Sequence, residues 1–139
     1  MNKMDVLVKV KTCLSEVGIN DNEYIIVYGA AMVLHGLKQE CNDIDITITP
    51  EAWDRIVKEK NIATRNYTSK PGHLVFTCHE DVDFFRGAVG MVTEPIGEEI
   101  DGVTIQTLES LRNEKLERGR DKDLIDVKLI DEFISKGDI

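Results

Sequence analysis

Cysteine is scarce in this 139-residue chain, and its three copies, Cys13, Cys41 and Cys78, are widely spaced with no CxxC pair. Such spacing gives neither a disulfide framework nor a zinc-ribbon signature, and an odd count is more typical of a reducing compartment than of secretion. No run approaches the ~18 apolar residues of a membrane span, and the N-terminal segment lacks the unbroken apolar stretch of a signal peptide. We therefore expect a cytoplasmic protein with no membrane partner.

Basic residues are also few: 17 Lys and Arg stand against 26 Asp and Glu, a formal net charge of −9. Because nucleic-acid backbones are bound through clustered Lys and Arg, we expect no sequence-independent binding of double-stranded DNA. The acidic balance instead suits a protein that binds cations. The length indicates one domain, residues 1–139, and with 42% hydrophobic residues that domain can bury a core without disulfides or a structural metal.

The spacing of apolar residues divides the chain into helices and strands. Helices are predicted at 4–17, at 30–35, from Pro50 onward, at 107–118 and at 121–135. Strands are predicted at 24–28, 43–48, 74–78, 81–85 and 103–105. This order predicts an α+β domain, with a mixed β-sheet of about four to six strands and helices packed on it.

Several side chains are predicted to be structural. Trp53 lies at helical spacing with Ile56 and is expected in the core, and His35 is expected to be a packed, hydrogen-bonded residue. His73 and His79, at the ends of the predicted hairpin, are more simply explained as plain loop residues. In the last helix the expected buried set is Leu124, Val127, Leu129 or Ile130, Phe133 and Ile134.

Paired carboxylates give the first sign of chemistry. Asp43 and Asp45 alternate with isoleucine, so both project from one face of a strand, about 7 Å apart. Asp81 and Asp83 repeat the spacing, and if the two strands are neighbours, up to four carboxylates converge. A cation would relieve their repulsion, and oxygen ligands suit Mg²⁺ or Mn²⁺, which support phosphoryl transfer. Taken alone, one such pair is more often a solvent-facing strand end.

A possible phosphate-binding segment precedes this strand. A buried-type strand runs into Gly29, which lets the backbone approach a ligand closely, and a helix follows at once. The N-terminus of a helix offers free N–H groups and a partial positive charge to a phosphate. Lys38, in the loop that follows, would add a positive charge; an ordinary solvated lysine is the competing interpretation.

Two segments together resemble the signature of the DNA polymerase β-type nucleotidyltransferase superfamily. They are residues 28–36 (YGAAMVLHG) and residues 43–46 (DIDI), with a gap of twelve residues between Ala30 and Asp43. The family's third carboxylate lies on a later strand, and Asp83 fits that pattern better than Asp81. The chain is most similar to small members of the AbiEii toxin-like type. The helix-pair motif of that type is matched by Lys115, Arg118, Arg120, Lys122, Asp123 and Asp126.

The resemblance implies a metal-dependent enzyme that transfers a nucleoside monophosphate from an NTP to an acceptor hydroxyl of tRNA, a protein or a small molecule. Asp43 and Asp45 would hold Mg²⁺ or Mn²⁺ on the triphosphate. Asp83, with a second metal, would orient the acceptor hydroxyl and help to deprotonate it. Nucleotide binding is further assigned to Gly29, Ala30, Lys38, Lys115 and Asp126.

Two alternatives stay open at the level of sequence. Ala30 stands where the family has a second Gly or a Ser, and the chain is short. Both features suit a catalytically silent relative that binds a nucleotide or a partner protein, as an antitoxin or anti-defence factor would. A third possibility is a fold relative that only carries surface charge, in which a helix would cover the Asp43 and Asp45 face. For Lys115, a solvated helix face competes with a functional role.

Overall fold

The structure is a computed structural model that describes residues 1–66, 74–87 and 97–137, so His73 lies outside the described residues. The described part has five helices: α1 (Lys3–Val17), α2 (Tyr28–His35), α3 (Pro50–Glu59), α4 (Leu108–Arg118) and α5 (Asp121–Gly137). Its strands are β1 (Tyr24–Val27), β2 (Ile44–Ile48), β3 (Arg65–Asn66), β4 (Leu74–Cys78), β5 (Val82–Arg86), β6 (Gly97–Ile100) and β7 (Val103–Gln106). The α+β prediction is confirmed. None of the described helices has the length and apolar character needed to cross a membrane.

The strands form one mixed sheet in the order β3-β4-β5-β2-β1-β7-β6. The pairs β2–β5 and β1–β7 are parallel, and the other pairs are antiparallel. Seven strands exceed the four to six expected, because β3 and β6 carry no usable pattern. β3 is two exposed residues long, and β6 reads Gly-Glu-Glu-Ile without alternation. Both strands lie at the edges of the sheet, where little apolar burial is required.

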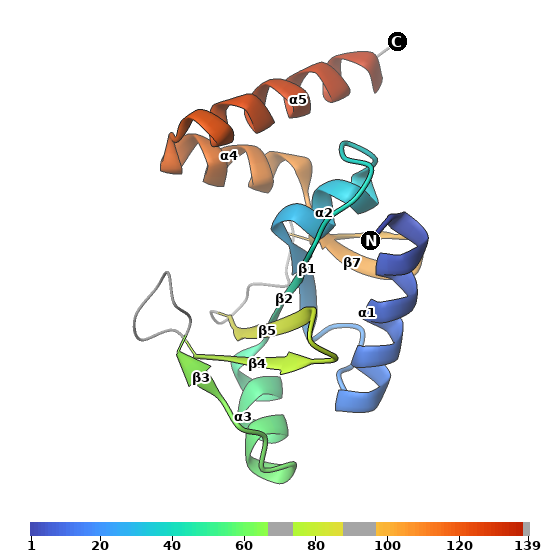
Figure 1. Ribbon diagram of the computed structural model, residues 1–139, viewed down its shortest axis with the longest axis vertical. Coiled ribbons are helices and arrows are strands. Elements are labelled where there is room, and N and C mark those ends of the chain that lie inside the picture. Colours follow the sequence, from blue (N-terminus) through green and yellow to red (C-terminus); the bar gives the residue numbers. More distant parts are fainter. Residues whose placement is uncertain (67–73, 88–96, 138–139) are drawn as a thin grey trace.

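The main core lies on one face of this sheet. Ile44, Ile46 and Ile48 of β2 are fully buried there, as the strict alternation predicts, and α1 and α3 pack over them. Trp53 of α3 is buried too, and Phe76 and Phe84 stack at 5.0 Å between ring centroids beneath it. Figure 1 shows α1 along the sheet and α3 at the end of the molecule opposite α4 and α5. Residues 45 and 47 therefore face away from the main core.

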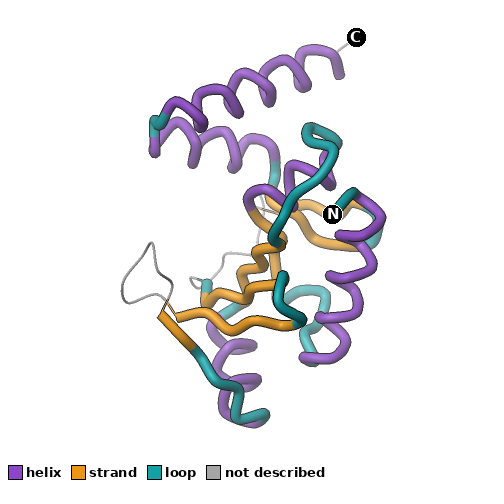
Figure 2. Tube along the Cα trace, viewed as in Figure 1, coloured by secondary structure: helices purple, strands orange, loops and turns teal. Residues whose placement is uncertain are grey.

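The two C-terminal helices form a pair that packs on α2 rather than on the sheet (Figure 2). Val127 and Ile130 of α5 are buried, and Ile130 clusters with residues of α2 and α4. Of the pair Leu129 or Ile130, Ile130 is the buried one. The prediction was wrong for Leu124, Phe133 and Ile134, which are all at least 39% exposed. α5 contacts the rest of the chain along a narrow stripe, which has room for few of its apolar side chains.

Candidate functional site

Asp45 and Asp83 lie side by side on neighbouring parallel strands. The register of β2 and β5 pairs Asp45 with Asp83, and the register of β4 and β5 pairs Asp83 with Thr77. On the other side of β2, Asp45 lies opposite Val27, the last residue of β1. Side chains in register across a sheet share a face, so Thr77, Asp83 and Asp45 form a row beside the end of β1. The two carboxylate strands are therefore neighbours, which was the condition for their carboxylates to converge.

The surroundings of the Asp45 carboxyl disfavour its charged form. Burial, followed by the charges of Asp83 and Asp43, raises the pKa of Asp45 to about 6. In the part of the chain that the structure describes, no group donates a hydrogen bond to this carboxyl. A half-buried carboxylate between two others, without a donor, is a group that a bound cation would stabilise.

Asp83, in contrast, already has partners. The Thr77 hydroxyl donates a hydrogen bond of 2.6 Å to Oδ1 of Asp83, and an Arg65 guanidinium nitrogen lies 3.5 Å from the same oxygen. Arg65 comes from the short edge strand β3, so three strands converge on this carboxylate. These partners turn Oδ1 of Asp83 toward the edge of the sheet.

The remaining acidic residues occupy different places. Asp43 is exposed just before β2 begins, close enough for its charge to act on Asp45. Asp81, the weaker candidate, forms an ion pair with Lys9 of α1. Asp43, Asp45 and Asp83 do not form a group whose oxygens all lie within 4.8 Å of one another. Gathering them around one ion therefore requires side-chain rotation, most of all at Asp83.

The junction between β1 and α2 differs from the one expected. Tyr28, not Gly29, has the left-handed backbone conformation, with φ of 58°, and such a conformation in a bulky residue is strained. A Cβ added at Gly29 would meet only Cys41 Cβ at 3.9 Å, an ordinary contact. Val27 is the N-cap of α2 and makes no side-chain hydrogen bond to it. The backbone N–H groups of Gly29 and Ala30 therefore have no capping side chain and can bind an anion.

Tyr28 is held from two directions. Its backbone N–H donates to Oε1 of the buried Gln106, at 3.3 Å, and the Arg118 guanidinium lies 5.0 Å from the centre of its ring. The backbone oxygen of Gln106 lies 2.7 Å from Nε2 of His35, whose side chain is only 4% exposed. His35 is thus the packed, hydrogen-bonded residue that was predicted. Arg118 brings a positive charge from α4 to the junction.

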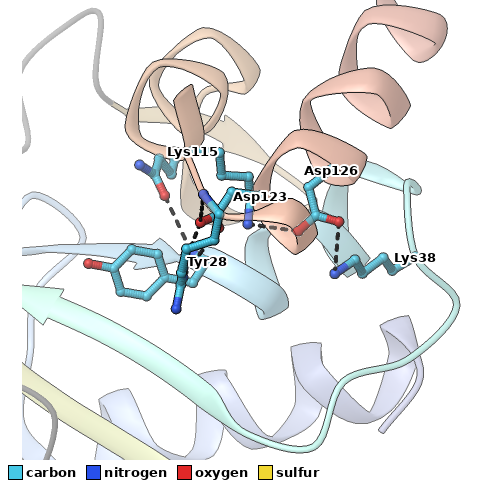
Figure 3. Close-up of polar contacts among 7 residues, drawn as sticks. Tyr28, Lys38, Lys115, Asp123 and Asp126 are labelled. Carbon is cyan, nitrogen blue, oxygen red and sulfur yellow. Dashed lines mark hydrogen bonds and ion pairs between the residues drawn. The ribbon is translucent and has the colours of Figure 1, made fainter. Parts of the chain in front are cut away.

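Lys38, Lys115 and Asp126 form a second polar cluster, drawn in Figure 3. One oxygen of Asp126 lies 2.8 Å from Lys115 Nζ, and the other lies 3.4 Å from Lys38 Nζ. The side chains of Lys115 and Asp126 are each 13% exposed, whereas Lys38 is 38% exposed. The cluster joins α4, α5 and the loop after α2, and Lys115 lies one helical turn from Arg118 on α4. The structure therefore brings these three predicted residues together.

Some residues around the candidate site had no sequence signal. Thr77 and Arg65 reach Asp83 only because β3 and β4 add to the edge of the sheet, and β3 was not predicted. Gln106 belongs to no motif. Its only sequence signal is its place at the end of a strand, directly before Thr107, the N-cap of α4. Tyr28 was part of the quoted motif, but its strained backbone was not foreseen.

The sequence was compared with models of known protein families and with curated proteins, and neither comparison gives a match. The interpretation of the site rests on its geometry.

Proposed function

We propose that this protein is a metal-dependent nucleotidyltransferase that transfers a nucleoside monophosphate from an NTP to an acceptor hydroxyl. The observation that carries the proposal is the pairing of Asp45 with Asp83 across β2 and β5. The Asp45 carboxyl is half-buried, and no group among the described residues donates a hydrogen bond to it. Burying repelling carboxylates costs stability, and a site that retains this cost is typical of a functional site. Mg²⁺ or Mn²⁺ fits this all-oxygen donor set.

In this proposal Asp43 and Asp45 would hold the cation, which would supply charge neutralisation on the triphosphate. Asp83 would hold the acceptor hydroxyl and take its proton as the oxygen attacks the α-phosphate and pyrophosphate leaves. Thr77 and Arg65 hold the Asp83 carboxylate in its orientation. The chemistry is mainly positioning and charge stabilisation.

The phosphates would lie against the first turn of α2. Val27, the N-cap of α2, pairs with Asp45 in register, so the amides of Gly29 and Ala30 and the Asp45 carboxylate lie at one end of the sheet. Lys38 and Lys115 share Asp126 as their ion-pair partner. Two ammonium groups and one carboxylate leave a net positive charge in this cluster, which would attract the phosphates.

A catalytically silent nucleotide- or partner-binding protein is the second candidate. Two observations favour it: the three carboxylates are not gathered within 4.8 Å, and both lysines are already engaged in ion pairs with Asp126. In this role Asp45 and Asp83 would bind a cation–nucleotide complex without transferring a group.

The first experiment measures the thermal stability of the wild type with each NTP, with and without Mg²⁺ or Mn²⁺. Asp45→Asn and Asp83→Asn test the site, and Asp101→Asn is the matched control. Asp101 is a surface residue with φ of 54°, a conformation that asparagine accepts. A ligand at 100 times its Kd adds about 2.7 kcal/mol of stability, a rise in Tm of several degrees.

The proposal predicts a metal-dependent rise in Tm for the wild type and Asp101→Asn, and none for the two site variants. A second arm supplies NTP labelled at the α-phosphate together with total RNA or protein extract. Transfer of label that depends on Asp83 supports the enzyme, and metal-dependent binding without transfer supports the silent candidate. Absence of any shift with every NTP would contradict the enzyme and leave a silent protein that binds a partner.

A further inference from the structure

A group of soft metal ligands lies on the opposite side of the sheet from Asp45. One ligand atom from each of Cys13, Cys78 and His79 lies within 4.8 Å of the others. These residues come from the middle of α1, the end of β4 and the turn that joins β4 to β5. No other group of at least three such residues is as close together in the described part of the chain.

The backbone delivers each ligand in a fixed way. Cys13 is fully buried on the α1 face that packs against the sheet, and Cys78 pairs with Val82 at the end of the β4–β5 ladder. His79 and Glu80 form the turn, with φ of 53° and 61°. Two consecutive left-handed residues usually require glycine or asparagine, so the turn holds His79 in a conformation that the sequence does not favour. Strain of this kind is more common at ligand sites than elsewhere.

The charges around the group are mostly negative. The Glu16 carboxylate lies 2.7 Å from Nε2 of His79 and 3.9 Å from Sγ of Cys78. Asp81 also acts on Cys13, and its Oδ1 is buried without a hydrogen-bond partner. Burial, followed by the Cys78 thiol and the Glu16 and Asp81 carboxylates, raises the pKa of the Cys13 thiol. Positive charge comes from Lys9, which pairs with Asp81, and from Lys60, whose Nζ donates to the backbone oxygen of Glu16 at 2.8 Å.

We propose that Cys13, Cys78 and His79 form a zinc-binding site that joins α1 to the β4–β5 hairpin. Two sulfurs and an imidazole nitrogen are ligands that Zn²⁺ favours over Mg²⁺. On binding, the two thiols release their protons to solvent, and Zn²⁺ takes the resulting thiolates and neutral His79 as ligands. His79 is 56% exposed and Cys78 is half-buried, so the ion can enter from solvent.

Glu16 acts as the positioning residue of this site. Its carboxylate holds one nitrogen of the His79 ring, leaving the other to face the ion, the arrangement in which carboxylates commonly orient metal-bound histidines. Cys13 and Glu16 are three residues apart on α1, so they lie on one face of that helix.

The test uses the whole reduced chain, stripped of metal with a chelator and kept with a phosphine reductant. Zn²⁺ is titrated in competition with a chromogenic chelator, and Co²⁺ serves as the spectroscopic probe, because thiolate ligation gives charge-transfer bands. The variants are Cys78→Ser, His79→Gln and Glu16→Gln. Cys41→Ser is the matched control, since Cys41 lies beside Met1, about three helical turns from Cys13.

The wild type and Cys41→Ser should bind one Zn²⁺ per chain and show cobalt–thiolate bands. Cys78→Ser and His79→Gln should weaken zinc binding by more than ~100-fold, and Glu16→Gln by roughly tenfold. His79 lies on a solvent-exposed turn, so His79→Gln should fold. This variant therefore tests the zinc site even if Cys78→Ser fails to fold. Absence of thiolate bands in the wild type, or zinc binding that depends on Cys41 instead, overturns the proposal. Nucleotide binding at Asp45 is not involved in either result.

Discussion

Asp45 shows at a single residue how the candidate site opposes the stability of the fold. Its folded pKa, about 6, lies above its ordinary value of 3.8 because of burial, Asp83 and Asp43. Between roughly pH 4 and 6 the folded state therefore keeps a proton that the unfolded state has lost. The stability contributed by this group falls as pH rises through that window and stays low above it.

We predict that Asp45→Asn stabilises the protein at pH 8, by about 1–3 kcal/mol after allowance for solvent screening. The advantage should shrink as pH falls from 6 and vanish near pH 4. Urea denaturation across this range measures it. Asp21→Asn, at an exposed turn, should show no such pH dependence. Equal stability of Asp45→Asn and the wild type at pH 8 would show that the carboxyl is not under this strain.

At the scale of elements, α4 and α5 are joined by ion pairs in addition to the apolar cluster that contains Leu111 and Ile130. The Arg112–Asp131 and Lys115–Asp126 ion pairs connect the two helices, with shortest distances of 2.6 and 2.8 Å. The first pair is well exposed and is worth little. The second is nearly buried, so losing one partner leaves an uncompensated charge.

Double-mutant cycles should separate the two lysines that share Asp126. We expect a coupling energy of about 1–3 kcal/mol between Lys115 and Asp126, and below ~1 kcal/mol between the more exposed Lys38 and Asp126. The variants are Lys115→Met, Lys38→Met and Asp126→Asn, compared by thermal and urea unfolding. Equal couplings would show that burial does not set the strength of these pairs.

The elements also show what the sequence could predict. Strict alternation predicted β2 with its buried face, because burial with period 2 fixes which side chains enter the core. The pairing of Asp45 with Asp83 followed only on the condition that their strands are neighbours, which the structure supplies. The edge strand β3 was missed, and with it the contact between Arg65 and Asp83. The Cys13–Cys78–His79 group was also missed, because 65 residues of sequence (13 to 78) separate its ends and only tertiary packing joins them.

At the scale of the whole molecule, the buried residues of the described part form one large and two small packing units. The main core is a large cluster on one face of the sheet. One small unit has four fully buried residues, shared among α2, α4 and α5, and the other consists of Ile25 and Val27 of β1. Small clusters with polar links open more readily than large apolar ones. The apolar residues exposed on α5 contribute little to holding it in place.

We therefore predict faster hydrogen exchange in α4 and α5 than in β1, β2 and β5. Exchange measured by mass spectrometry on the whole chain should show α4 and α5 exchanging through local opening, while the three strands exchange only on global unfolding. α1, which packs on the main core, provides a helical comparison. Uniform protection across all helices would mean that the chain opens as a single cooperative unit.

The parallel pairing of β2 with β5 ties the position of the acidic residues to the alternation of buried residues along both strands. The even-numbered residues enter the core, from 44 to 48 in β2 and from 82 to 84 in β5. Asp45 and Asp83 have odd numbers and face the other side of the sheet. One residue inserted inside β5 would exchange its two faces, carrying Asp83 into the core and Phe84 out to the candidate site. A two-residue insertion would leave the faces unchanged. The positions of the acidic residues are therefore fixed by the same alternation that fills the core. Selection for a packed sheet alone would keep Asp45 and Asp83 on one face.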